Sequence, residues 1–166
     1  MAELTPQERL YPSLLDRLTD NEPHKSQESR EARVFSIRRL RAAVLRDLSW
    51  LLNTCHLQTS QDLSDYPNVQ KSVLNYGIPE LTAKTASGLQ LIDIQRAIRQ
   101  AICDFEPRVL PHSLEVRAIV ADEEMSHNAL TFEIEAELWS RPLPERLFLK
   151  TEIDLDTGHI SVTDQF

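Results

Sequence analysis

The chain has 166 residues, which fits one domain, and its formal net charge of −8 argues against binding to nucleic acid or to an anionic membrane surface. Hydrophobic residues make up 41%, enough for a core, yet no apolar run approaches the roughly 18 residues that a membrane span needs. The first residues have no basic region and no apolar core, so we expect no secretion signal. Cys55 and Cys103 lie far apart, which fits reduced thiols in a cytosolic protein.

Residues 1–33 have the pattern of an N-terminal arm and linker. Leucines at positions 10, 14, 15 and 18 recur at helical spacing, and a polar stretch with Pro23 follows them. We expect a short amphipathic helix on a polar tether, which docks either on its own domain or in a groove of a partner. Residues 34–166 would then form a single domain.

Two longer helices are predicted from apolar residues that recur every three or four positions. The first spans residues 34–54 and the second residues 89–105. A short helix that begins at Pro67 and includes Val73 and Leu74 is expected between them, followed by a turn at Gly77. The first long helix is basic, which we interpret as a solvated face or local ion pairs, with contact to an acidic partner as the alternative. Its arginines are Arg33, Arg38, Arg39, Arg41 and Arg46.

From residue 111 onward the apolar period changes to two, which predicts strands. We expect strands over residues 114–120, 130–138, 145–155 and 159–162, with a polar turn at 122–128. One face of these strands is apolar and the other charged, so helices should cover a single face of the sheet. Helices first and strands last indicate an α+β fold with a mainly antiparallel sheet, and a mixed sheet stays open.

The most informative stretch is Phe105-Glu106-Pro107-Arg108, at the end of the second long helix. A helix C-terminus carries partial negative charge, so a glutamate there needs a cation or N–H groups to hold it. Pro107 favours an extended conformation for Glu106, and side chains two apart in an extended segment share a face. Glu106 and Arg108 can therefore form an internal salt bridge or an oriented binding site for another protein. Our candidate partner-binding residues are Glu106, Pro107 and Arg108.

The residues argue against other chemistry. A glycosidase needs a protonated general acid, and Arg108 beside Glu106 would keep that carboxylate charged. Asp156-Thr157-Gly158 follows an apolar strand and so matches the aspartic-protease tripeptide. No second glycine-containing segment suits the rest of such an active site, so we interpret the tripeptide as a hairpin turn. The five histidines do not fall at metal-ligand spacing. We therefore expect no catalytic residue, no metal and no cofactor.

Four stretches, in order and over nearly the whole chain, carry a resemblance to a known family. They are 13–18 (S-L-L-D-R-L), 46–48 with 51–54 (R-D-L and L-L-N-T), 72–79 (S-V-L-N-Y-G-I-P) and 105–108 (F-E-P-R). With these stretches the chain resembles the TssE baseplate subunits of bacterial type VI secretion systems. Those subunits are related to the phage contractile-tail baseplate wedge proteins once described as lysozyme-like. The triplet at 106–108 is that family's hallmark.

The resemblance implies a structural, non-enzymatic part of a cytoplasmic baseplate that is docked at the inner membrane without inserting into it. It implies that the protein joins the wedge subunits TssF and TssG and helps to initiate the TssB–TssC sheath. TssK and the spike are further candidate partners, and no nucleic acid is implied. It also links Glu106 and Arg108 to baseplate and sheath contacts, and the edge of the sheet could template the first sheath ring.

Two alternatives to this function stay open. One is a regulatory protein-binding module, because the fold family also includes a stress-response anti-adaptor. The other, less favoured, is a lysozyme-like glycosidase.

Overall fold

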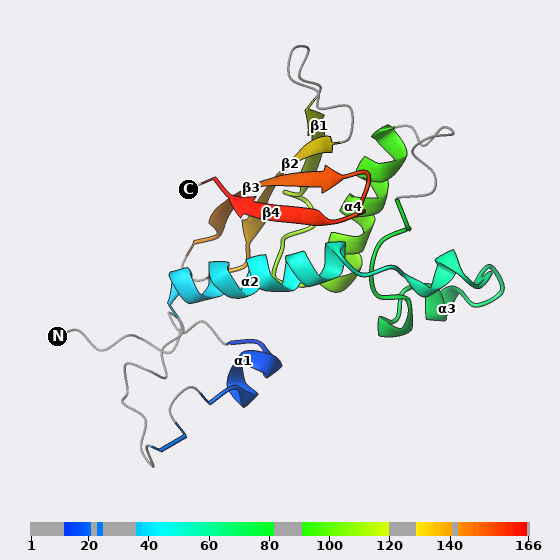
Figure 1. The fold of residues 1–166 in the computed structure, drawn as a ribbon. Helices are drawn as coiled ribbons and strands as arrows, with labels where there is room; N and C mark the ends of the chain where they lie inside the picture. The colour runs from blue at the N-terminus through cyan, green and yellow to red at the C-terminus, as the bar shows by residue number, and fades with distance from the viewer. Residues whose placement is uncertain are drawn as a thin grey trace.

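The computed structural model describes residues 12–20, 23–24, 36–81, 91–119, 129–140 and 143–165. Within these residues helices come first and strands last, so the predicted α+β class is confirmed (Figure 1). Some predictions lie outside the described residues: Leu10, most of the linker, the first residues of both long helices, and the turn at 122–128. None of the described helices is long and apolar enough to cross a membrane.

The sheet has four strands, joined in chain order and antiparallel throughout. Among the described residues the sheet therefore contains no parallel pair, so the mixed sheet that the sequence left open is not found there. The strands are β1 (Glu115–Ile119), β2 (Ala129–Leu138), β3 (Glu145–Asp154) and β4 (Ile160–Asp164).

The two faces of the sheet differ as the period of two predicts. Val116, Ile134 and Leu149 face one another across β1, β2 and β3, and all three are buried. On the other face Glu137 lies opposite Arg146, and acidic and basic residues in such positions attract each other weakly, at about 0.2–1 kcal/mol per pair. The apolar face is thus the only one that the helices need to cover.

The turn between β3 and β4 holds the Asp-Thr-Gly tripeptide, as predicted. The carboxylate of Asp154 accepts the backbone N–H groups of Asp156 and Thr157, at 2.8 and 3.2 Å. Gly158 has a φ of +70°, a conformation that glycine adopts without steric cost. Because these residues form the turn, β4 begins at Ile160, one residue later than expected.

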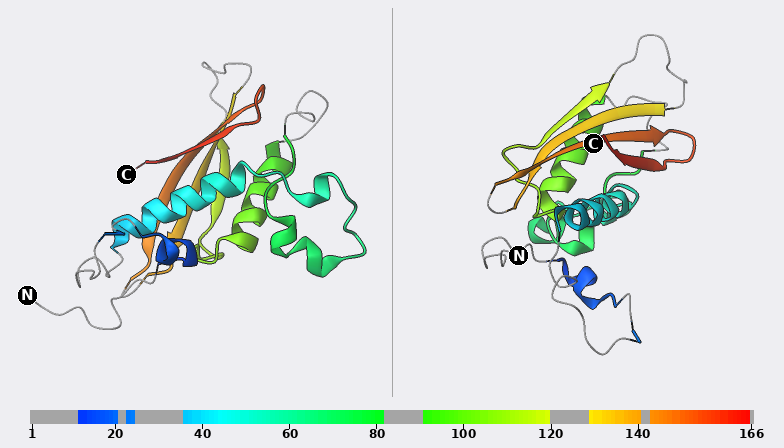
Figure 2. Two further views of the ribbon diagram at one scale, coloured as in Figure 1. Left: turned by 60° about the horizontal axis from the view of Figure 1, so that its bottom comes forward. Right: turned by 90° about the vertical axis from the view of Figure 1, so that its left-hand side faces the viewer.

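Two helices, α2 (Ile37–Leu52) and α4 (Leu91–Phe105), lie on the apolar face of the sheet (Figure 2). α4 packs against β1, and α2 packs against β4 and α4. α2 ends two residues before the predicted end because the side chain of Asn53 turns to β4. Its amide nitrogen donates to the carbonyl of Ile160 at 2.8 Å, and its amide oxygen accepts the N–H of the same residue at 2.9 Å.

The arginines of α2 have different surroundings. Arg38 is exposed, whereas Arg41 pairs with Asp164 and Arg46 pairs with acidic side chains described below. The prediction of a solvated face or local ion pairs therefore holds for these three residues. Arg33 lies outside the described residues.

Between the two long helices, residues 53–81 form only short elements: η2 (Leu57–Thr59), α3 (Pro67–Gln70) and η3 (Val73–Asn75). The predicted single helix from Pro67 through Leu74 is wrong, because α3 ends at Gln70 and Val73 starts a separate 3-10 turn. The turn at Gly77 is confirmed: its φ is +123°, and an added Cβ would lie 2.2 Å from the carbonyl oxygen of Thr54. Both the positive φ and the close contact with Thr54 require glycine at position 77.

The helix of the arm, α1 (Leu14–Leu18), begins at Ser13, whose hydroxyl accepts the backbone N–H of Asp16 at 3.3 Å. It lies beneath α2 (Figures 1 and 2) and buries none of its residues. Its leucines at 14, 15 and 18 are exposed. α1 therefore lies against its own domain, but none of its residues is buried there.

Candidate functional site

The Glu-Pro-Arg corner begins where α4 ends, and its backbone is anchored to the sheet. The carbonyl of Arg108 accepts the N–H of Trp139 at 2.7 Å, and the N–H of Leu110 donates to the carbonyl of Glu137 at 2.8 Å. An isolated antiparallel bridge joins Val109 to the last residue of β2 between these two bonds. The corner thus connects the end of α4 to the end of β2.

Glu106 and Arg108 bind each other. The Nε of Arg108 donates to the Oε1 of Glu106 at 2.6 Å, its backbone N–H donates to the same oxygen at 3.1 Å, and its Nη2 donates to Oε2. The side chain of Glu106 is buried, with 4% of its surface exposed, while that of Arg108 keeps 19%. Of the two predicted possibilities, this isolated chain contains the internal salt bridge. Pro107 between them is exposed.

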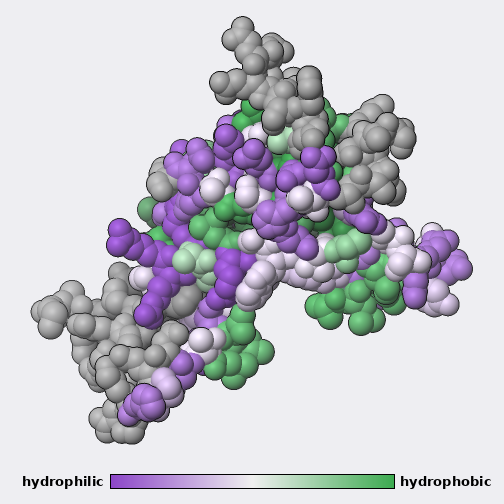
Figure 3. All heavy atoms as spheres, in the orientation of Figure 1, coloured by the Kyte–Doolittle hydropathy of each residue, from purple (hydrophilic) through white to green (hydrophobic). Residues whose placement is uncertain are grey.

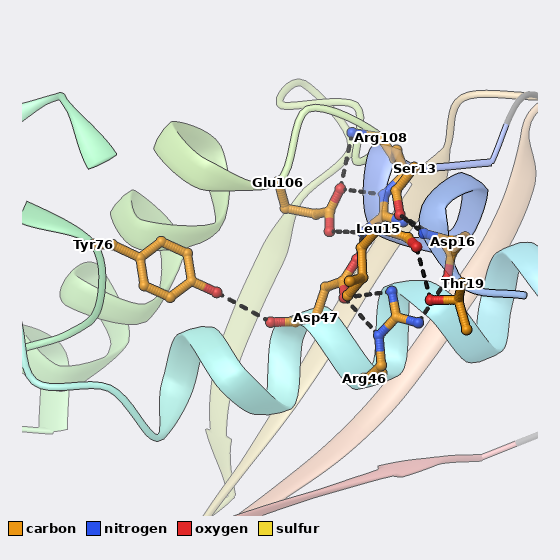
Figure 4. Close-up of polar contacts among 9 residues, drawn as sticks. All are labelled: Ser13, Leu15, Asp16, Thr19, Arg46, Asp47, Tyr76, Glu106 and Arg108. Atoms are coloured by element: carbon orange, nitrogen blue, oxygen red, sulfur yellow. Dashed lines mark hydrogen bonds and ion pairs between the residues drawn. The ribbon is translucent and has the colours of Figure 1, made fainter. Parts of the chain in front are cut away.

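The pair belongs to a longer network of alternating charges (Figure 4). Nη2 of Arg108 also donates to Asp47 on α2 at 2.6 Å. Asp47 accepts the Nε of its neighbour Arg46 at 2.9 Å, and Nη1 of Arg46 donates to Asp16 on α1 at 2.6 Å. Three carboxylates and two guanidinium groups therefore run without interruption from the end of α4 across α2 to α1.

The network shifts the pKa values of its members. Burial alone lowers the pKa of Arg108, but hydrogen bonds and charge from Glu106 and Asp47 outweigh it and raise that pKa above its usual value. The hydrogen bond from Arg46 lowers the pKa of Asp16, against a smaller opposing effect of burial. Within the described residues, Nη1 of Arg108 is buried and has no hydrogen-bond partner. This is one guanidinium donor that the isolated chain leaves unused.

Aromatic rings flank the network on two sides. Tyr76 packs edge-to-face on Phe105, with ring centroids 5.3 Å apart, and its hydroxyl donates to the carbonyl of Asp47 at 3.4 Å. Burial, and then the charges of Asp47 and Glu106, raise the pKa of Tyr76. On the other side Arg46 lies 5.2 Å from the ring centroid of Trp50, a half-exposed side chain.

All four sequence stretches that carry the family resemblance meet in this place. The first supplies Asp16, the second Arg46 and Asp47, the third Tyr76, and the fourth Phe105, Glu106 and Arg108. Sequence reasoning singled out only residues 106–108, and missed Asp16, Asp47 and Tyr76 as members of the site. The sequence could have indicated these three residues, because each lies inside one of the stretches that carry the family resemblance.

Such an arrangement holds three helices in fixed positions and leaves Pro107 and the edge of Arg108 at the surface. No group of three or more metal-ligating side chains occurs among the residues described. Cys55 is exposed and Cys103 half-buried, and both are free thiols. The site is thus a rigid junction with a small exposed corner.

Comparison with family models matches residues 38–143 to the baseplate wedge protein gp25. That range covers more than half of the chain, and includes Asp47, Tyr76 and the corner at 106–108. Searches of curated proteins and of solved structures gave no match.

Proposed function

We propose that this chain, which belongs to the family of the baseplate wedge protein gp25, is the wedge subunit of a type VI secretion baseplate. The family is one of structural baseplate proteins that associate with other baseplate components. The finer proposal is that the protein joins TssF and TssG and helps to start the TssB–TssC sheath, with TssK and the spike as further candidate partners. It would act in the cytoplasm, on a baseplate held at the inner membrane.

The observation that carries the proposal is the charge network at the Glu-Pro-Arg corner. Glu106 is buried and paired, so we assign it the role of fixing Arg108 and Pro107 in place. Pro107 and the exposed edge of Arg108 are then the groups that reach a partner. A preorganised guanidinium of this kind binds a carboxylate or a carbonyl oxygen with little loss of side-chain entropy.

The proposed role is structural rather than enzymatic. Both oxygens of Glu106 accept hydrogen bonds from Arg108. A carboxylate held in this way is poorly suited to donate a proton to a glycosidic oxygen. We also propose the division into an arm at residues 1–33 and one domain at 34–166.

The test is the double variant Glu106→Ala with Arg108→Ala, made in cells that assemble the machine. We expect the protein to stay folded and to lose sheath assembly, which fluorescent TssB would report. Pro107→Ala, which keeps the salt bridge, should weaken assembly less. Arg99→Ala, which changes an exposed arginine of α4, is the matched control and should assemble sheaths normally.

Normal sheath assembly by a folded double variant would contradict this role for the corner. A pull-down with the wild-type chain separates the other classes of function. Recovery of a response-regulator adaptor in place of the wedge subunits would favour the regulatory module. Cleavage of peptidoglycan that Glu106→Gln abolishes would favour the glycosidase.

A further inference from the structure

An open groove lies between the first half of α2 and the place where β3 begins and β4 ends. Its apolar lining consists of Ile37, Ala42 and Leu45 from α2 and Pro144, which directly precedes β3. Leu143, next to this proline in the chain, is exposed over 74% of its surface. Figure 3 shows hydrophilic side chains around the start of α2, with a paler area between them.

Charged side chains in the groove fall into two groups. Arg41 is fixed inside: it donates to both oxygens of Asp164, at 2.7 and 3.0 Å from Nη2, and contacts Glu145 at 3.4 Å. These three residues largely satisfy one another. Arg38 on α2 and Arg146 on β3 are exposed, and neither forms an ion pair within the part of the chain that the structure describes.

The groove therefore combines an apolar lining with an internally paired cluster, Arg41 with Asp164 and Glu145, and has two exposed arginines at its edge, in a chain whose net charge is −8. The two arginines flank apolar surface from separate elements, and within the described residues Arg146 has only the weak cross-strand attraction to Glu137. Charges at the rim of an interface raise the association rate and select the partner by its sign. Exposed apolar surface between such charges is typical of a binding site.

Resting on the baseplate role proposed above, we propose that this groove binds an acidic amphipathic segment of another baseplate protein. Apolar side chains of that segment would cover Ala42 and Leu45, and its carboxylates would pair with Arg38 and Arg146. None of the network residues lines the groove, although Arg46 lies one helical turn from Ala42 on α2. Glu106 and Arg108 do not line it, so the proposed roles of the corner and of the groove can fail independently.

Photocrosslinking of the full chain in its native cells tests this binding. Ala42, exposed and inside the groove, is replaced by p-benzoylphenylalanine, and the crosslinked peptide is sequenced. We expect a peptide of another protein in which apolar residues alternate with aspartate or glutamate. A crosslink to residues 1–33 of the same chain, a crosslink to a second copy, or no crosslink would overturn the proposal.

Charge reversal then tests the chemistry of the contact. Arg38→Glu with Arg146→Glu should reduce the crosslink yield at least about tenfold, whereas Arg96→Glu with Arg99→Glu, an equal change of charge at exposed positions of α4, should not. Unchanged melting temperatures would show that both variants are folded. Replacing the carboxylates of the captured peptide by lysine should restore the crosslink to the doubly reversed chain. An unchanged crosslink yield after the charge reversal would contradict the proposed pairing. So would a crosslink that the lysine substitutions in the captured peptide fail to restore.

Discussion

At the scale of single residues, Arg108 is the centre of the candidate site because it bridges two carboxylates from different elements. Glu106 has almost no access to water, and both of its carboxylate oxygens are hydrogen-bonded to this guanidinium. Removing one partner of a buried ion pair leaves the other charge uncompensated. This is more costly than losing both partners together.

We predict that Arg108→Ala lowers the free energy of unfolding by about 3–5 kcal/mol. Urea denaturation of the purified chain measures the change. Arg117→Ala is the control, because Arg117 pairs with Glu115 and Glu135 at exposed positions and its loss should cost about 1 kcal/mol or less. Equal losses of unfolding free energy in the two variants would mean that the buried pair of Glu106 and Arg108 stabilises the fold no more than an exposed ion pair does.

Gly77 offers a second test, of the turn that holds Tyr76 against the network. In Gly77→Ala the new Cβ would meet the Thr54 carbonyl at 2.2 Å, on a backbone that disfavours side chains. We expect a loss of at least about 1–3 kcal/mol from the strained conformation alone. Thermal unfolding would show it as a lower melting temperature. Gly158→Asn, at a φ of +70° that asparagine tolerates, should have a clearly smaller effect.

At the scale of elements, α1 is held to α2 by charge and not by apolar packing. The carboxylate of Asp16 has a lowered pKa because it accepts a hydrogen bond from Arg46. A carboxylate whose folded pKa is lowered stabilises the folded contact above its unfolded pKa. The contact is lost as the pH falls through the lowered value.

We therefore predict that α1 separates from α2 in acid, below a pH of about 3.8, the ordinary value for aspartate. The NMR signal of the Trp50 indole reports the change, because Arg46 lies over that ring. In Asp16→Asn the contact should already be weakened at neutral pH, and the signal should lose its acid transition. An acid transition that persists unchanged in this variant would show that another group controls it.

Elements were predictable where one period dominates the pattern. The alternating residues of β2 and β3 placed both strands within one residue of their ends, since a shift of one position would turn every apolar side chain to water. Between Pro67 and Leu74 no period is sustained, and hydrogen bonds from Asn75 decide the path. Its side chain accepts the N–H of Gln58 and donates to the carbonyl of Gln70, contacts that no local pattern indicates.

At the scale of the whole molecule, we expect the proposed arm to add little to the stability of the domain, judging from α1. None of the residues of α1 is buried, and its ionic contact with α2 is partly exposed to solvent. We predict that a chain lacking residues 1–33 unfolds in one cooperative transition, with a free energy of unfolding within about 1 kcal/mol of the full chain. Urea denaturation followed by circular dichroism measures both. A loss of several kcal/mol would contradict the proposed division of the chain.

The candidate site was predictable only in part. The corner at 106–108 was visible because a proline after an apolar helix is a strong local signal, and its salt bridge was one of two foreseen outcomes. Asp47 could not be assigned to Arg108, because the two residues are 61 positions apart and meet only when α2 packs on α4. Asp16 was harder still to assign. It lies on α1, and the position of α1 against α2 itself depends on the ion pair between Asp16 and Arg46.

The backbone bonds between the corner and the end of β2 also have a mechanical consequence. A load applied at Pro107 would not simply peel α4 from its end, because the main chain on the far side of the proline is bonded to Glu137 and Trp139. Tension would pass into the antiparallel ladder and spread over its strands. Such a distribution of force would help a structural protein to keep its shape under a sudden load.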